Sequence, residues 1–136
     1  MPAVFFTFDN FRPLVQHLVG QLNRFDRDHQ EQFSILFFPV KEKDNRMLSR
    51  AFERALRESD ALFQAQEHFF LVLPRTGREG ALIVLKGVEE LLGEYVDEAI
   101  VTYPEDGETA EALLDKLVNL VKSWCKIDLH FPDIQP

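Results

Sequence analysis

The sequence predicts an α+β sandwich in which helices flank a central antiparallel sheet. The order of its apolar segments carries this prediction, because residues 33–103 give strand, helix, hairpin, helix and strand in turn, the order of a ferredoxin-like sandwich. The chain also has no Gly/Ser-rich linker and no internal repeat. With 136 residues and 46% hydrophobic content, residues 1–136 are expected to form a single domain with its own core.

The first third of the chain predicts one amphipathic helix and one buried strand. Residues 11–25 place apolar side chains at helical spacing, and Pro13 suits a first helical turn. The face expected to be buried consists of Leu14, Val15, Leu18, Val19, Leu22 and Phe25. Residues 33–38 are nearly all apolar and predict a strand covered on both faces, which Pro39 ends or leaves at an edge. Residues 4–8 are a further candidate edge strand.

The rest of the chain alternates helices and strands. The expected elements are a helix over 45–58, a hairpin of strands over 61–65 and 68–73, a helix over 77–92, a strand within 96–103, a helix over 109–124 and a strand over 127–131. The hairpin would turn at Gln66-Glu67, a pair without the usual Gly or Asn. Thr109 is expected to cap the last helix as half of a capping box.

Composition excludes several classes of function. The chain carries 15 Lys and Arg residues against 23 Asp and Glu residues, and a net charge of -8 would repel a nucleic-acid backbone. No apolar run approaches the roughly 20 residues that span a bilayer, and the start lacks the basic region of a secretory signal. The single cysteine, Cys125, cannot form an internal disulfide, which fits a reducing compartment. We expect a cytoplasmic protein that neither binds nucleic acid nor inserts into a membrane.

Three segments carry a likeness to a known family: residues 54–60 (RALRESD), residues 70–81 (FLVLPRTGREGA) and residues 100–114 (IVTYPEDGETAEALL). In this order they resemble parts of the GGDEF family, the diguanylate cyclase domains that condense two GTP molecules into cyclic di-GMP. The parts are the end of a helix before the signature hairpin, the strand and helix after it, and the late strand, loop and last helix. The resemblance is strongest over residues 50–124 and implies a nucleotide-cyclase-like form of the sandwich.

The catalytic positions implied by this resemblance carry the wrong residue types. The Gly-Gly-Asp/Glu-Glu-Phe signature matches residues 66–70 (QEHFF), so the glycines that let the backbone approach a nucleotide and the acidic pair are both missing. The metal-binding carboxylates after the first family strand fall on Pro39 and Lys41, which supply no ligand for a hard cation. We interpret the domain as degenerate and catalytically inactive, with no catalytic residue, cofactor or metal.

One functional motif of the family does match. An inhibitory Arg-x-x-Asp site that binds cyclic di-GMP lies five residues before the signature, and residues 57–60 (RESD) have that spacing. The guanidinium of Arg57 could form a bidentate contact with guanine O6 and N7, and the carboxylate of Asp60 could accept from its N–H groups, each good pair being worth roughly 1–3 kcal/mol. Arg46, Arg50, Arg54 and Arg57 are also spaced to form a basic stripe on the second helix. The predicted ligand-binding residues are Arg50, Arg54, Arg57 and Asp60.

Simpler interpretations of these residues stay open. The Arg-x-x-Asp pattern also describes an exposed helix end with a surface salt bridge, and Glu53 and Glu58 would partly neutralise a solubilising basic face. Histidines lack metal-ligand spacing with one another and with Cys125. They are His17, His29, His68 and His130.

Two hypotheses for the function follow. In the first, the chain is a signalling receptor for cyclic di-GMP, with a homodimer or a protein partner completing the site. In the second, it is a ligand-independent protein-interaction domain on the same fold.

Overall fold

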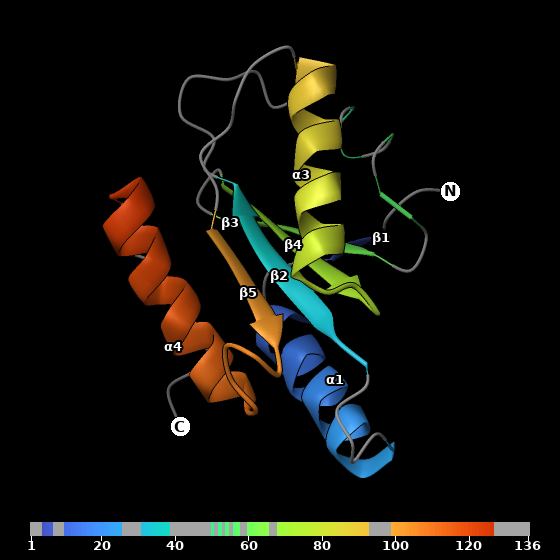
Figure 1. Ribbon diagram of the computed structural model, residues 1–136, viewed down its shortest axis with the longest axis vertical. Helices are drawn as coiled ribbons and strands as arrows, with labels where there is room; N and C mark the ends of the chain where they lie inside the picture. The colour runs from blue at the N-terminus through green and yellow to red at the C-terminus, as the bar shows by residue number, and fades with distance from the viewer. Residues whose placement is uncertain are drawn as a thin grey trace.

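The computed structural model of the chain consists of a five-stranded sheet with helices on both faces (Figure 1). The structure describes residues 4–6, 10–25, 31–38, 50, 52, 54, 56–57, 60–65, 68–92 and 99–126. Its elements are β1 (Val4–Phe6), α1 (Phe11–Phe25), β2 (Phe33–Phe38), β3 (Ala61–Ala65), β4 (His68–Pro74), α3 (Arg78–Leu92), β5 (Ala99–Tyr103), α4 (Ala110–Leu120) and the π-helical turn η2 (Val121–Cys125). The α+β sandwich predicted from the sequence is confirmed.

The sheet has the order β1-β3-β4-β2-β5. Its four strands β3, β4, β2 and β5 are antiparallel neighbours, and only β1, at the edge, runs parallel to its neighbour β3 among the strands that the structure describes. Strand β2 lies inside the sheet and all six of its residues are buried, as its continuous apolar run predicts. The hairpin register pairs Ala65 with His68, so residues 66 and 67 connect β3 to β4, although their geometry lies outside the described residues.

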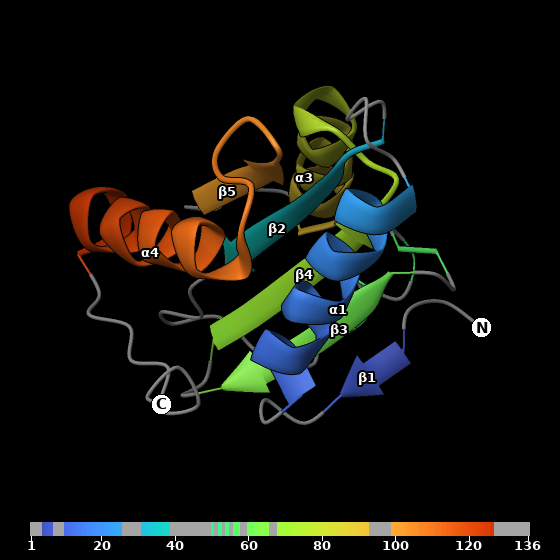
Figure 2. The same cartoon turned by 90° about the horizontal axis from the view of Figure 1, so that it is seen from below.

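Each face of the sheet carries its own apolar core, because side chains alternate along each strand. In β2, Ile35 and Phe37 point to the face covered by α1 and α4, whereas Leu36 and Phe38 point to the face covered by α3. Figure 2 shows α1 and α4 on one side of the strands and α3 on the other. Phe52 and Leu56, two described residues between β2 and β3, join the core on the α3 side.

The apolar face predicted for α1 is partly wrong. Phe11, Val15 and Val19 are its buried residues, whereas the predicted Leu14, Leu18 and Leu22 only pack at the border of the core. Phe25 is 77% exposed. Spacing alone cannot choose between two neighbouring apolar stripes on one helix. The end of α1 extends past the end of the sheet (Figure 1).

Two further boundaries differ from the prediction. Arg50, Phe52 and Arg54 are helical but Leu56 and Arg57 are not, so the second helix ends before the expected Glu58. The helix expected over residues 109–124 ends in the π-helical turn η2, and the side chain of Thr109 caps its start by accepting from the N–H of Ala112 at 3.1 Å. The strand expected over residues 127–131 lies outside the described residues. In the part of the chain that the structure describes, no helix is long and apolar enough to cross a bilayer.

Candidate functional site

Arg57 and Asp60 lie together where the chain enters β3. The N–H of Asp60 donates to the carbonyl of Arg57 at 3.0 Å, which closes a turn just before the strand. The Asp60 side chain is only 1% exposed, and both of its oxygens are used by Arg57: Oδ2 accepts from the backbone N–H at 2.8 Å, and Oδ1 lies 3.4 Å from guanidinium Nη2. The carboxylate is therefore a partner of Arg57 rather than an open ligand contact.

The guanidinium of Arg57 is held at Nη2 by the protein, whereas Nε and Nη1 are not. Its Nη2 also donates to Oγ1 of Thr76 at 2.8 Å and to the carbonyl of Pro74 at 3.2 Å. The Thr76 hydroxyl in turn donates to the same carbonyl at 3.0 Å. All three acceptors hold one nitrogen, so Nε and Nη1 make no hydrogen bond to the described residues, and the side chain is 60% exposed. This arrangement presents a positioned guanidinium, with its Nε and Nη1 donors, to solvent.

The two other predicted arginines lie on the preceding helical segment. Arg50 and Arg54 are four residues apart and both exposed, and neither has a hydrogen bond or ion pair with any residue that the structure describes. Arg57 follows the end of the helix, so it extends the basic stripe through the turn to β3 and not along a regular helical face. The stripe's first member, Arg46, and its acidic neighbours Glu53 and Glu58 lie outside the described residues.

A buried chain of polar groups runs from Thr76 across the end of the sheet. The Ser34 hydroxyl donates to the carbonyl of Thr76 at 2.8 Å and lies 3.0 Å from Oγ1 of Thr102, where it accepts because its own proton is already used. The N–H of Thr102 donates to Oδ2 of Asp106 at 2.8 Å. Oδ1 of Asp106 then pairs with Nζ of Lys116 at 2.8 Å. These contacts satisfy polar groups that burial would otherwise penalise.

Sequence reasoning identified Arg57 and Asp60 but missed this chain of partners. Ser34, Thr76 and Thr102 stand in three separate elements, and no short spacing connects them. Their contacts depend on the register of the sheet, which pairs Phe33 with both Pro74 and Tyr103.

Two of the residues that match the catalytic signature, Phe69 and Phe70, form part of the core. Phe69 is fully buried and Phe70 is 1% exposed, and the ring of His68 lies 5.3 Å from the ring of Phe37. A divalent cation with oxygen ligands does not fit these side chains, because two are phenyl rings packed in the apolar core. Among the described residues, no group of three or more His, Cys, Asp or Glu side chains could hold a metal ion.

Comparison with solved structures identifies the fold. A GGDEF domain of the Pseudomonas aeruginosa protein TpbB, also called YfiN, superposes with a TM-score of 0.65 at 18% identity, over 82% of this chain and 78% of that one. A DGC protein of Thermotoga maritima superposes with a TM-score of 0.68 at 16% identity, over 85% of this chain and 94% of that one. A sensory box/GGDEF family protein of Caulobacter crescentus superposes with a TM-score of 0.66 at 12% identity, over 91% of this chain and 95% of that one.

The chain has the GGDEF fold. No protein-family sequence model matches it, and a search of curated proteins finds no match either. In this GGDEF fold, the connection between β3 and β4 is where the family signature aligns, whereas Arg57 and Asp60 lie at the other end of β3. The Arg-x-x-Asp residues and the signature positions are therefore separated by the length of one strand.

Proposed function

We propose that this chain is a non-catalytic GGDEF domain that binds cyclic di-GMP in the cytoplasm, with Arg57 as the direct contact. Arg50 and Arg54 would attract the phosphates of the ligand, and Asp60 would hold the Arg57 side chain in place. The observation that carries the proposal is the geometry of Arg57, whose guanidinium is 60% exposed and yet tied through Nη2 to three acceptors.

A positioned guanidinium suits recognition of a guanine base. Nε and Nη1 keep N–H donors that can each bond a guanine acceptor such as O6 or N7, and the positive charge strengthens either contact. Since the side chain is already held by Asp60, Pro74 and Thr76, binding costs little of its rotamer entropy. Cyclic di-GMP has two guanines and one Arg57 can serve only one of them, so we expect a second copy or a partner domain to complete the site.

The absence of catalysis rests on the signature positions. The family's acidic pair aligns with His68 and Phe69, and a fully buried Phe69 in the core leaves no carboxylate to bind a metal. The sequence offers Pro39 and Lys41 at the other metal positions. Metal-assisted phosphoryl transfer needs metal-binding carboxylates at both sets of positions.

Titration of the full chain with cyclic di-GMP by calorimetry tests the binding proposal. We expect saturable heat, and we expect Arg57→Ala to weaken the affinity by roughly tenfold or more, because a hydrogen bond to a charged group is worth about 1.5–3 kcal/mol. Arg24→Ala, an exposed arginine at the end of α1, is the matched control and should bind as the wild type does. Equal affinities for Arg57→Ala and the wild type would contradict the proposal.

Incubation with GTP and either Mg²⁺ or Mn²⁺ tests the absence of catalysis. We expect no cyclic di-GMP and no pyrophosphate by chromatography, whereas an active diguanylate cyclase assayed alongside should convert its substrate. Turnover by this chain would overturn its assignment as a non-catalytic domain.

A second candidate function is a ligand-independent interaction domain, and one observation favours it. The outer face of α3 exposes three large apolar side chains, Ile83 at 70%, Leu91 at 42% and Leu82 at 36%. Exposed apolar residues grouped on one helix are typical of a protein contact. A folded sample that gives no heat with cyclic di-GMP would favour this candidate over the first.

A further inference from the structure

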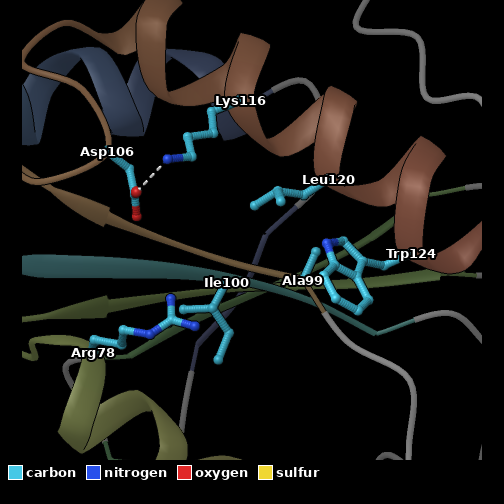
Figure 3. Close-up of a pocket in the computed structure, with 7 residues that line it drawn as sticks. All are labelled: Arg78, Ala99, Ile100, Asp106, Lys116, Leu120 and Trp124. Carbon is cyan, nitrogen blue, oxygen red and sulfur yellow. Dashed lines mark ion pairs between the residues drawn. The ribbon is translucent and has the colours of Figure 1, made fainter.

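A groove of about 370 Å³ lies along β5, between α4 with η2 on one side and the start of α3 on the other (Figure 3). Strand β5 is the edge of the sheet among the described strands, so backbone groups on its outer side point into this space. None of the predicted site residues Arg50, Arg54, Arg57 and Asp60 lines the groove. It is thus a second concave feature, separate from the Arg57 site.

One end of the groove is cationic. Nζ of Lys116 lies 2.8 Å from Oδ1 of Asp106, and Lys116 keeps 48% of its side chain exposed. Arg78 is also exposed and has no hydrogen bond or ion pair with any residue that the structure describes. Among the described residues that line the groove, Arg78 and Lys116 are cations and Asp106 is an anion. The groove is thus more basic than the whole chain, whose net charge is -8. An anionic group would meet Arg78 here, which pairs with no described residue, and it would meet Lys116 beside the carboxylate of Asp106.

The other end of the groove is aromatic and apolar. Figure 3 shows the indole of Trp124 at the end away from Asp106, Lys116 and Arg78, with Leu120 between. Trp124 is 73% exposed, although an indole is among the most favourable side chains to bury. Its flat face next to apolar neighbours is a stacking surface for another planar ring.

We propose that this groove binds a planar aromatic molecule that carries an anionic group, the chemistry of a purine mononucleotide. The ring would stack on Trp124 and the phosphate would lie between Arg78 and Lys116, since the two ends of the groove separate these chemistries in the same way. The volume is near the lower end of the range of about 300–1,000 Å³ for ligand sites, which favours one base over a cyclic dinucleotide. The proposal does not depend on the function assigned to Arg57.

Tryptophan fluorescence tests this directly, because Trp124 is the only tryptophan of the chain. The full chain is titrated with GMP, with guanosine, with inorganic phosphate and with cyclic di-GMP. We expect saturable quenching by GMP. The affinity for guanosine should be lower than that for GMP by roughly tenfold or more, because guanosine lacks the charge-assisted contacts. Absence of quenching by GMP, or equal quenching by guanosine and GMP, would overturn the proposal.

Variants separate a binding site from random collision with an exposed indole. The pair Arg78→Gln and Lys116→Gln together should weaken GMP binding by roughly tenfold or more. Lys122→Gln, an exposed lysine of η2 that does not line the groove, should leave it unchanged. Arg57→Ala should also bind GMP normally, so failure here is distinguishable from failure at the Arg57 site. Unaltered quenching in the double variant, with an unfolding curve like that of the wild type, would show collision only.

Discussion

Replacing Phe70 by alanine is expected to lower the free energy of unfolding by about 3–5 kcal/mol, the range for removing a buried phenyl ring. Phe70 is 1% exposed, in a strand with neighbours on both sides. Its ring centroid lies 5.2 Å from that of Phe11 and 5.1 Å from that of Phe37, so it joins α1 to two strands. Few neighbours can move into the cavity, because two of them are large rings held by a helix and a strand.

The measurement is urea unfolding followed by circular dichroism, with two matched variants. Phe70→Leu keeps most of the apolar volume and should lose less stability than Phe70→Ala. Phe25→Ala removes a phenyl ring that is 77% exposed and should change stability by about 0.5 kcal/mol or less. The total free energy of unfolding of a native domain is about 5–15 kcal/mol, so Phe70→Ala would remove a large share of it. A loss for Phe70→Ala as small as that for Phe25→Ala would contradict the packing described above.

The same position explains which part of the family signature this chain keeps. Phe70 aligns with the phenylalanine of the signature, and its contacts with Phe11 and Phe37 are structural. The acidic pair of the signature falls on His68 and Phe69, and the ring centroid of Phe69 lies 5.0 Å from that of Phe52 on the other face of the sheet. Packing in the two cores accounts for phenylalanine at both positions.

Strands were easier to predict from the sequence than the face of a helix. The runs over residues 33–38 and 61–65 are confirmed with the same bounds. Both are rich in apolar residues, Pro39 follows the first, and Gln66 and Glu67 follow the second. The bounds of α1 are also confirmed, yet its buried stripe is rotated from the predicted one. Two apolar stripes lie side by side on that helix, and only the position of the sheet decides which one is covered.

The candidate site was predicted in its residues but not in its contacts. The spacing of Arg57 and Asp60 indicates two groups near each other, and the structure places them in one turn. The spacing does not indicate that Asp60 is buried, because the burial of Asp60 follows from the packing of β3 into the sheet. Thr76 and Pro74 could not be found either, since they reach Arg57 only through the pairing of β3 with β4.

Replacing Asp60 by alanine is expected to cost about 1.5–3 kcal/mol of stability, the range for hydrogen bonds to a charged group. The substitution leaves the backbone N–H of Arg57 without its 2.8 Å acceptor and releases Nη2 from one of its three acceptors. Asp115→Ala, at an exposed aspartate of α4, is the control and should change stability by about 0.5 kcal/mol or less. Equal unfolding free energies for the two variants would show that the Asp60 contacts contribute nothing.

The same variants decide how Asp60 acts on the ligand. If Asp60 positions Arg57, Asp60→Ala should weaken cyclic di-GMP binding although the carboxylate is only 1% exposed, because a freed guanidinium must be ordered again on binding. Asp60→Asn keeps an oxygen that can accept the N–H of Arg57 and should restore part of the affinity. A direct contact with guanine predicts no such recovery, since an amide that presents its N–H₂ to the guanine N–H groups would bind no better than alanine. Calorimetric titration of both variants beside Arg57→Ala therefore separates a positioning residue from a ligand contact.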